Sequence, residues 1–274
     1  MDIPTPPFAD VSLAGFKIEE VLPLNDPLTV PLLRLMIATN DVLHLQKLLV
    51  TVRDVDEAST ESDKWIHEGE VGHLFRLLCG YLYEAMRPFR AVDQTDDDRL
   101  DKAAAVDQQG LEALAALRYA YDPQRTQEIK DSFLYLVRHK IAFHYDDQEL
   151  RASFERHGQG GSEGVLVIAQ GYVPSRFCLT DMLITLVIAD GMKENPQKFA
   201  ENYMRWIGEA IDLAGQLAIA VDHLLAYLLG PHKDRIEIRA DRVTIHPAVR
   251  AATDKVEEER RRAREHDKSQ EESR

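Results

Sequence analysis

The chain has 274 residues, of which 45% are hydrophobic and 29% charged. This composition is typical of a globular protein rather than a disordered one, and the length suffices for a core without disulfides or metals. The formal net charge of −14 argues against broad, nonspecific coating of nucleic acid, because an acidic surface repels phosphate at long range. Cys79 and Cys178 are far apart in the sequence, which indicates buried thiols in a reducing compartment.

No targeting or membrane segment is expected. The first residues lack the basic and apolar regions of a signal peptide. The longest apolar stretch, residues 213–229, is interrupted by Gln216, Asp222 and His223, whereas a spanning helix needs about 20 mostly apolar residues. We therefore expect a cytoplasmic protein without membrane contact.

Long helices are predicted in the first half of the chain. Residues 1–27 are rich in proline and have no clear period, which indicates an extended N-terminal arm. Apolar residues at helical spacing predict a helix over residues 30–55 and a second over residues 62–86, which Ser62 begins and Pro88 ends. The same spacing predicts a third helix over residues 99–121 and, after a break at Asp122 and Pro123, a fourth over residues 124–145.

The second half alternates between glycine-rich, β-branched and apolar segments. A loop at residues 158–164 precedes a predicted β-hairpin over residues 165–179, and helices are predicted over residues 181–192 and 197–229. Alternating apolar residues predict another small hairpin over residues 235–246, with Ala240 and Asp241 near its bend. The charged residues from 253 onward predict a frayed helix or a disordered tail.

Together these elements predict a mainly α protein, an up-and-down helical bundle with long C-terminal helices and one or two small β-hairpins. The expected organisation has four parts. They are an extended arm at residues 1–27, a helical bundle at 28–157, a β-hairpin with C-terminal helices packed on the same body at 158–252, and a charged tail at 253–274.

One segment of the fourth predicted helix carries acid–base chemistry. Residues 137–146 read Val-Arg-His-Lys-Ile-Ala-Phe-His-Tyr-Asp. His144 has the kind of side chain whose charge changes near neutral pH, and Arg138 stays charged and can hold a phosphate. Such a pair can cleave RNA without a metal, because the histidine moves the proton of the 2′-hydroxyl and the arginine offsets the charge of the transition state.

The spacing of this pair sets a condition on its assembly. Residues six apart lie about 120° apart around a straight α-helix and about 9 Å apart along it. Arg138 and His144 therefore need a bend in the helix or a second copy of the chain to form one site. Arg138 and Tyr145 do share a face, and Lys140 and His144 are neighbours on the helix surface.

This segment resembles the R-x4–6-H motif of the HEPN superfamily. In that motif an arginine is followed by a polar residue and then, a few positions later, by a histidine, near the end of one of the last helices of a bundle. The match here consists of Arg138, His139 and His144, with five residues between the outer two. The continuation Phe143-His144-Tyr145-Asp146 also resembles HEPN-like bacterial proteins. Residues 30–157 match by their helix pattern, whereas the later hairpin and long helices have no counterpart that we can assign.

The resemblance implies a homodimer of helical bundles whose two motifs line one cleft. It implies a metal-independent endoribonuclease or an RNA-binding protein of a defence or toxin–antitoxin system, with a protein antitoxin or regulator as a further partner. Arg138 would hold the phosphate and His144 would be the general acid or base. His139, Lys140, Tyr145 and Asp146 would support them, and no cofactor or metal is expected.

Other interpretations of the same residues stay open. Arg138 can pair with Asp131, Asp146 or Glu149, and His144 can hydrogen-bond inside the bundle. The chain would then be a noncatalytic helical module for dimerisation or protein interaction. A small-molecule pocket between bundle helices is a third alternative.

Two further groups of polar residues predict structure rather than catalysis. His67 and His73 are six apart, whereas a zinc protease needs its two histidines four apart on one helix face. Asp222 and His223 lie in an apolar helix and predict a buried, satisfied polar pair. Polar residues of the second predicted helix could still face the motif as a supporting wall: Glu68, Glu70, His73 and Arg76.

Overall fold

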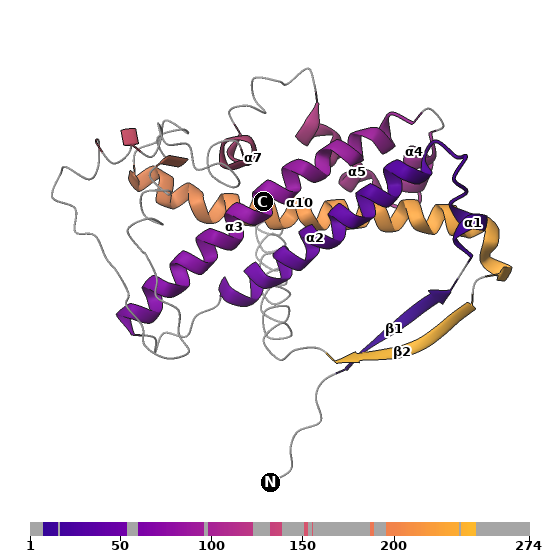
Figure 1. The fold of residues 1–274 in the computed structure, drawn as a ribbon, viewed down its shortest axis with the longest axis horizontal. Helices are drawn as coiled ribbons and strands as arrows, with labels where there is room; N and C mark the ends of the chain where they lie inside the picture. The colour runs from indigo at the N-terminus through magenta and orange to yellow at the C-terminus, as the bar shows by residue number, and fades with distance from the viewer. Residues whose placement is uncertain are drawn as a thin grey trace, which may run out of the picture.

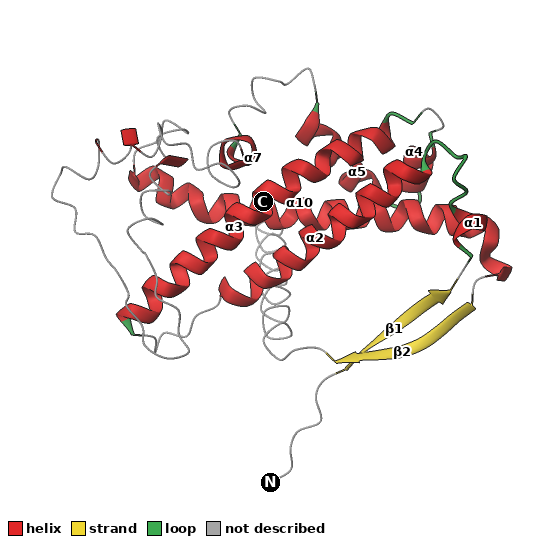
Figure 2. Ribbon diagram, in the orientation of Figure 1, coloured by secondary structure: helices red, strands yellow, loops and turns green. Residues whose placement is uncertain are grey.

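The predicted mainly α fold is confirmed over the part of the chain that the structure describes. The computed structural model describes residues 8–15, 17–53, 60–95, 98–122, 132–138, 151–152, 155, 187–188, 196–235 and 237–244. Helices pack around one hydrophobic core, and a two-stranded ribbon lies off this bundle (Figures 1 and 2).

Two long helices, α2 (Thr29–Arg53) and α3 (Glu61–Asp93), pack against each other. The prediction that Pro88 ends the second of these is wrong, because α3 continues past it. A proline inside a helix costs about 3 kcal/mol, since it has no N–H to donate to the carbonyl four residues earlier, here that of Glu84. The fully buried ring of Phe89, directly after the proline, offsets part of this cost.

The predicted helix over residues 99–121 is in fact two helices. A turn separates α4 (Arg99–Ala104) from α5 (Gln108–Tyr121), and Asp107 caps α5 by accepting the N–H of Gly110 at 2.8 Å. The spacing of apolar residues does not predict such a break. The break arises because the Asp107 side chain takes a backbone hydrogen bond that would otherwise continue the helix. A Cβ at Gly110 would lie 2.6 Å from the carbonyl oxygen of Ala104, so the turn requires glycine there.

The longest helix, α10 (Pro196–Leu229), runs through the bundle as predicted. It packs against α2, α4 and α5. Its buried side chains include Trp206, Ile207, Ala210, Ala214, Leu217, Val221 and Leu224. By length and composition the segment Asn202–Asp234 could cross a membrane, and 28% of its most apolar window is buried within the structure. The contacts with the other helices account for that buried part.

Strand β1 (Phe8–Gly15) pairs antiparallel with strand β2 (Glu237–Thr244). Short helices α1 (Ile18–Val21) and η4 (Gly230–Arg235) lie between the strands and the bundle (Figure 1). The pairing corrects the hairpin predicted over residues 235–246, because Ala240 and Asp241 lie inside one continuous strand rather than at a bend. The alternating pattern identifies a strand but carries no information about a partner near the other end of the sequence.

Several predictions concern residues outside the described part of the chain. These are the loop at residues 158–164, the hairpin over residues 165–179 and the tail at residues 253–274. Within the helix predicted over residues 181–192, Val187 and Ile188 are described, and both are helical and buried.

Candidate functional site

The helix that carries Arg138 begins later than predicted. Ser132 has an extended backbone, and its hydroxyl accepts the N–H of Tyr135 at 3.3 Å, which makes it the N-cap of α7 (Phe133–Leu136). A continuous helix over residues 124–145 is therefore wrong. Val137 and Arg138 continue α7 as a π-helical turn, a wider turn that often occurs at functional sites.

Aromatic packing fixes α7 on the bundle. The ring of Phe133 lies 6.1 Å from the ring of Phe75 on α3 and 6.1 Å from that of Trp206 on α10, measured between centroids. Val137 is fully buried one turn later. The core therefore determines where the next residue, Arg138, leaves the bundle.

Arg138 is held by Glu84 of α3. Its Nε and Nη2 atoms donate hydrogen bonds to Oε1 of Glu84 at 2.8 and 2.5 Å. The Arg138 side chain is 18% exposed and the Glu84 side chain 50% exposed, so the ion pair lies at the surface. An exposed ion pair contributes only about 0.2–1 kcal/mol, and a competing anion can replace it.

Two tyrosines lie beside this ion pair. Tyr83 precedes Glu84 on α3, Tyr135 lies one turn before Arg138 on α7, and their rings meet edge to face with centroids 5.8 Å apart. The pKa of Tyr83 is raised, first by its partial burial and then by Tyr135 and the Glu84 carboxylate, against a lowering by Arg138. Tyr83 therefore keeps a neutral hydroxyl near pH 7.

The structure thus places one member of the predicted catalytic pair. His139, Lys140, His144, Tyr145 and Asp146 lie outside the described residues. The structure shows Glu84 as a partner of Arg138. The local carboxylates considered from the sequence, Asp131, Asp146 and Glu149, lie outside the described residues. Glu84 lies 54 positions away, and no local pattern marks it.

The structure places the four residues of the predicted polar wall on α3, but residues 139–146, which they would face, lie outside the described part of the chain. Glu68, Glu70 and His73 have exposed side chains, whereas Arg76 is buried in α3. The carboxylate that joins α3 to the motif segment comes from Glu84, further along the same helix.

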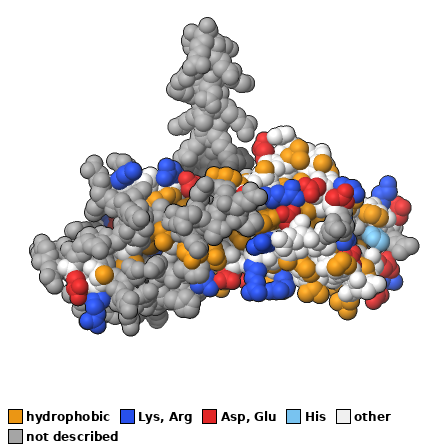
Figure 3. Space-filling model, turned by 90° about the horizontal axis from the view of Figure 1, so that it is seen from above, with side chains coloured by type: hydrophobic (Ala, Val, Ile, Leu, Met, Phe, Trp, Pro, Cys, Tyr) orange, Lys and Arg blue, Asp and Glu red, His pale blue; other side chains and the backbone are white. Residues whose placement is uncertain are grey.

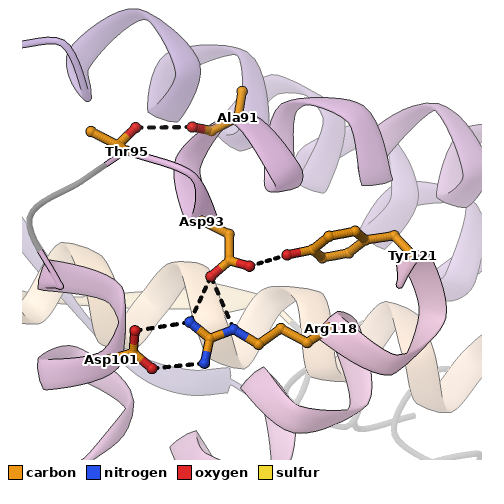
Figure 4. Close-up of polar contacts among 6 residues, drawn as sticks. All are labelled: Ala91, Asp93, Thr95, Asp101, Arg118 and Tyr121. Carbon is orange, nitrogen blue, oxygen red and sulfur yellow. Dashed lines mark hydrogen bonds and ion pairs between the residues drawn. The ribbon is translucent and has the colours of Figure 1, made fainter. Parts of the chain in front are cut away.

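A second polar cluster joins the ends of α3, α4 and α5 (Figure 4). Arg118 donates to Oδ1 of Asp93 from Nε and Nη2 at 3.0 and 2.7 Å, and to both oxygens of Asp101 at 2.7 and 2.8 Å. The hydroxyl of Tyr121 donates to the other oxygen of Asp93. The hydrogen bond from Arg118 lowers the pKa of Asp101, so this carboxylate is committed to the arginine. We interpret the cluster as structural.

His223 of α10 contacts the turn between α4 and α5. Its Nε2 lies 3.1 and 3.2 Å from the two oxygens of Asp107, and its Nδ1 lies 2.8 Å from the carbonyl oxygen of Ile219. The Asp107 carboxylate and the Ile219 carbonyl can only accept hydrogen bonds. Both contacts are therefore hydrogen bonds only when the two nitrogens of the imidazole each carry a proton. The pKa of His223 is raised, chiefly by the Ile219 carbonyl. The prediction of an Asp222–His223 pair needs correction, because Asp222 is exposed and the paired carboxylate is that of Asp107.

Among the residues with described positions, no group of three or more His, Cys, Asp or Glu side chains could hold a metal ion. No family model, curated protein or solved structure matches this chain.

Proposed function

We propose that this protein is a HEPN-like, metal-independent endoribonuclease or RNA-binding protein of a defence or toxin–antitoxin system, acting as a cytoplasmic homodimer. One observation supports the proposal. Arg138 reaches the surface from a segment anchored in the core, and its partner there is a carboxylate that a phosphate can replace. Carboxylate and phosphate oxygens are equivalent acceptors for a guanidinium. Glu84 would then occupy the place of an RNA phosphate.

In the proposed reaction His144 takes the proton of the 2′-hydroxyl group. The 2′ oxygen attacks phosphorus, the bond from phosphorus to the 5′ oxygen breaks, and a proton passes to the leaving oxygen. The products are a 2′,3′-cyclic phosphate and a 5′-hydroxyl. Arg138 would offset the charge that builds on the phosphate oxygens, and the rings of Tyr83 and Tyr135 offer surfaces on which a base can stack.

RNA binding by charge-neutral variants of Glu84 tests the role of the ion pair. Glu84→Gln removes the competing anion, so a short single-stranded RNA should bind about two- to fivefold more tightly, matching the free energy of an exposed pair. Arg138→Ala should weaken binding. The control is Glu209→Gln, since Glu209 is also 50% exposed and also paired, with Arg205 at 3.4 Å. Fluorescence anisotropy at one fixed salt concentration measures all variants, and equal effects of the two glutamine variants would contradict the proposal.

Cleavage is tested separately in EDTA with an end-labelled RNA. Wild type should leave cyclic-phosphate ends, and His144→Ala should lower the rate by about 10²–10⁴-fold while helicity and RNA binding persist. Equal residual cleavage by wild type and variant would rule out catalysis by His144 and leave RNA binding as the proposed activity.

The same ion pair supports a second candidate, a noncatalytic helical module for dimerisation or protein interaction. Here the pair has only the role of fixing α7 on α3. This candidate predicts that Arg138→Ala and Glu84→Gln lower the melting temperature by similar amounts, and that RNA is neither bound nor cut.

A further inference from the structure

Helix α2 carries large apolar side chains on two opposite faces. One face is buried against α3 and α10. On the opposite face the Ile37 side chain is 64% exposed and that of Val30 53%, and Leu33 and Leu48 are exposed as well. A helix at the surface of a monomeric protein presents mostly polar residues to solvent, so large apolar side chains along this exposed face are unusual.

Three of these exposed residues form one seam along the helix. At about 100° per residue, Val30, Ile37 and Leu48 lie within about 20° of one another around the axis. Steps of three and four residues connect them through further exposed residues, Arg34, Asp41 and His44. Alternating steps of three and four are the spacing at which one helix packs lengthwise against another.

The charges of this seam complement those of the same seam on a second copy of α2 related by a two-fold axis. Arg34 lies three residues before Ile37 and Asp41 four residues after it, about 4.5 and 6 Å along the axis. When a second α2 runs antiparallel with the two Ile37 side chains adjacent, Arg34 of each copy faces Asp41 of the other to within about 1.5 Å. Two ion pairs then flank a central apolar contact.

We propose that the exposed face of α2 binds α2 of a second copy of this chain, antiparallel and about a two-fold axis near Ile37. A two-fold interface uses the same patch on both partners, so that patch must complement itself. The seam meets this condition with one cation and one anion on opposite sides of its central isoleucine, and these two charges cancel although the chain carries −14. An unrelated partner would not require both charges at matching offsets on one helix.

The bundle leaves this face accessible. Figure 1 shows α2 crossing in front of α10, and the side chains of Val30, Ile37 and Leu48 are exposed. Over the molecule as seen in Figure 3, hydrophobic side chains reach the surface among charged ones. The interface would supply the second subunit on which the proposed function rests, but the argument depends on residues of α2 alone.

Charge reversal tests the interface without RNA. Arg34→Asp and Asp41→Arg each place like charges opposite each other twice, so each should weaken the dimer at least about tenfold. The double variant Arg34→Asp with Asp41→Arg restores opposite pairs and should recover most of the affinity. Analytical ultracentrifugation measures the dissociation constants, and circular dichroism checks that the helical content is unchanged. A monomeric wild type, or a dimer indifferent to the single reversals, would overturn the inference, whereas failure of RNA binding would not affect it.

Disulfide trapping tests the position of the two-fold axis. In a Cys178→Ser background Ile37→Cys should form a covalent dimer under mild oxidation, because the two copies of residue 37 are adjacent; the other native cysteine, Cys79, is fully buried. Leu111→Cys is the control, since Leu111 is a 46% exposed leucine on α5. Equal trapping at the two positions, or none at residue 37, would overturn the proposed geometry.

Discussion

At the residue scale, Arg118 shows how one side chain can hold several helix ends. The Asp93 side chain is only 10% exposed, whereas Arg118 and Asp101 are 40% and 54% exposed. Removing the arginine would leave a nearly buried carboxylate with the Tyr121 hydroxyl as its remaining partner in the cluster (Figure 4). An unpaired buried charge costs more than the loss of an exposed ion pair.

We therefore predict that Arg118→Ala lowers the free energy of unfolding by about 1–3 kcal/mol. Arg118→Lys keeps the charge but loses the fork that reaches both carboxylates, and should have an intermediate effect. Asp101→Asn, which removes an exposed partner, should cost less than about 1 kcal/mol. Urea unfolding ranks the three variants, and an Arg118→Ala value no larger than that of Asp101→Asn would show that Asp93 does not need this partner.

The candidate site could be predicted from the sequence only where its residues are close together in the chain. Arg138 was identifiable because its chemistry and its spacing to His144 are local properties of the chain. Glu84 was not, because a glutamate on an amphipathic helix looks the same whether it faces water or a distant arginine. The packing of Phe133 against rings of two other helices brings Arg138 to Glu84. That packing is a property of the folded chain.

At the scale of elements, apolar spacing predicted the long helices but not their ends. Pro88 does not stop α3, and burial of Phe89 directly after it offsets part of the cost of the missing hydrogen bond. Asp107 does stop the helix before it, since its carboxylate caps the next one. Both outcomes depend on competition between local backbone preference and tertiary contacts. The spacing of apolar residues contains no information about that competition.

The contact between α10 and the cap of α5 should depend on pH. Both nitrogens of His223 face acceptors, and the pKa of His223 is raised above its ordinary value near 6.5, chiefly by the Ile219 carbonyl and further by Asp107 and Asp222. A raised pKa in the folded state means that the folded protein holds the proton more tightly than the unfolded chain. The resulting stability is fully present below pH 6.5 and is lost as the pH rises through the pKa of the folded state.

His223→Gln should therefore destabilise the protein more at pH 5 than at pH 8. Urea unfolding of wild type and variant at several pH values gives the difference in free energy of unfolding, which should shrink with rising pH. His67→Gln on α3 serves as the control for the loss of one histidine. A difference that stays constant, or that grows with pH, would show that His223 is neutral in the folded protein.

At the scale of the whole molecule, the mainly α class could be predicted and the pairing of β1 with β2 could not. Eight residues of β1 pair with eight of β2, so the described part of the chain begins and ends in one sheet. A strand pattern specifies which side chains share a face, but the partner is chosen by the path of the helices between the two strands. Here that path ends in α10 and η4, which bring residue 237 back to residue 15.

This ribbon should contribute little to the stability of the bundle. It lies apart from the helices in Figure 1, and an isolated pair of strands is only marginally stable in water. Deleting residues 1–15 removes β1, and we expect the melting temperature of the helical body to fall by less than about 3 °C, which corresponds to less than about 1 kcal/mol. The backbone amides of residues 237–244 should lose their protection against hydrogen exchange, because β2 then has no partner strand. Deleting residues 1–7, which leaves β1 in place, is the matched control and should preserve that protection. A much larger fall in melting temperature on removing β1 would mean that the sheet stabilises the bundle through α1 and η4, and that β1 and β2 fold as one unit with the helices.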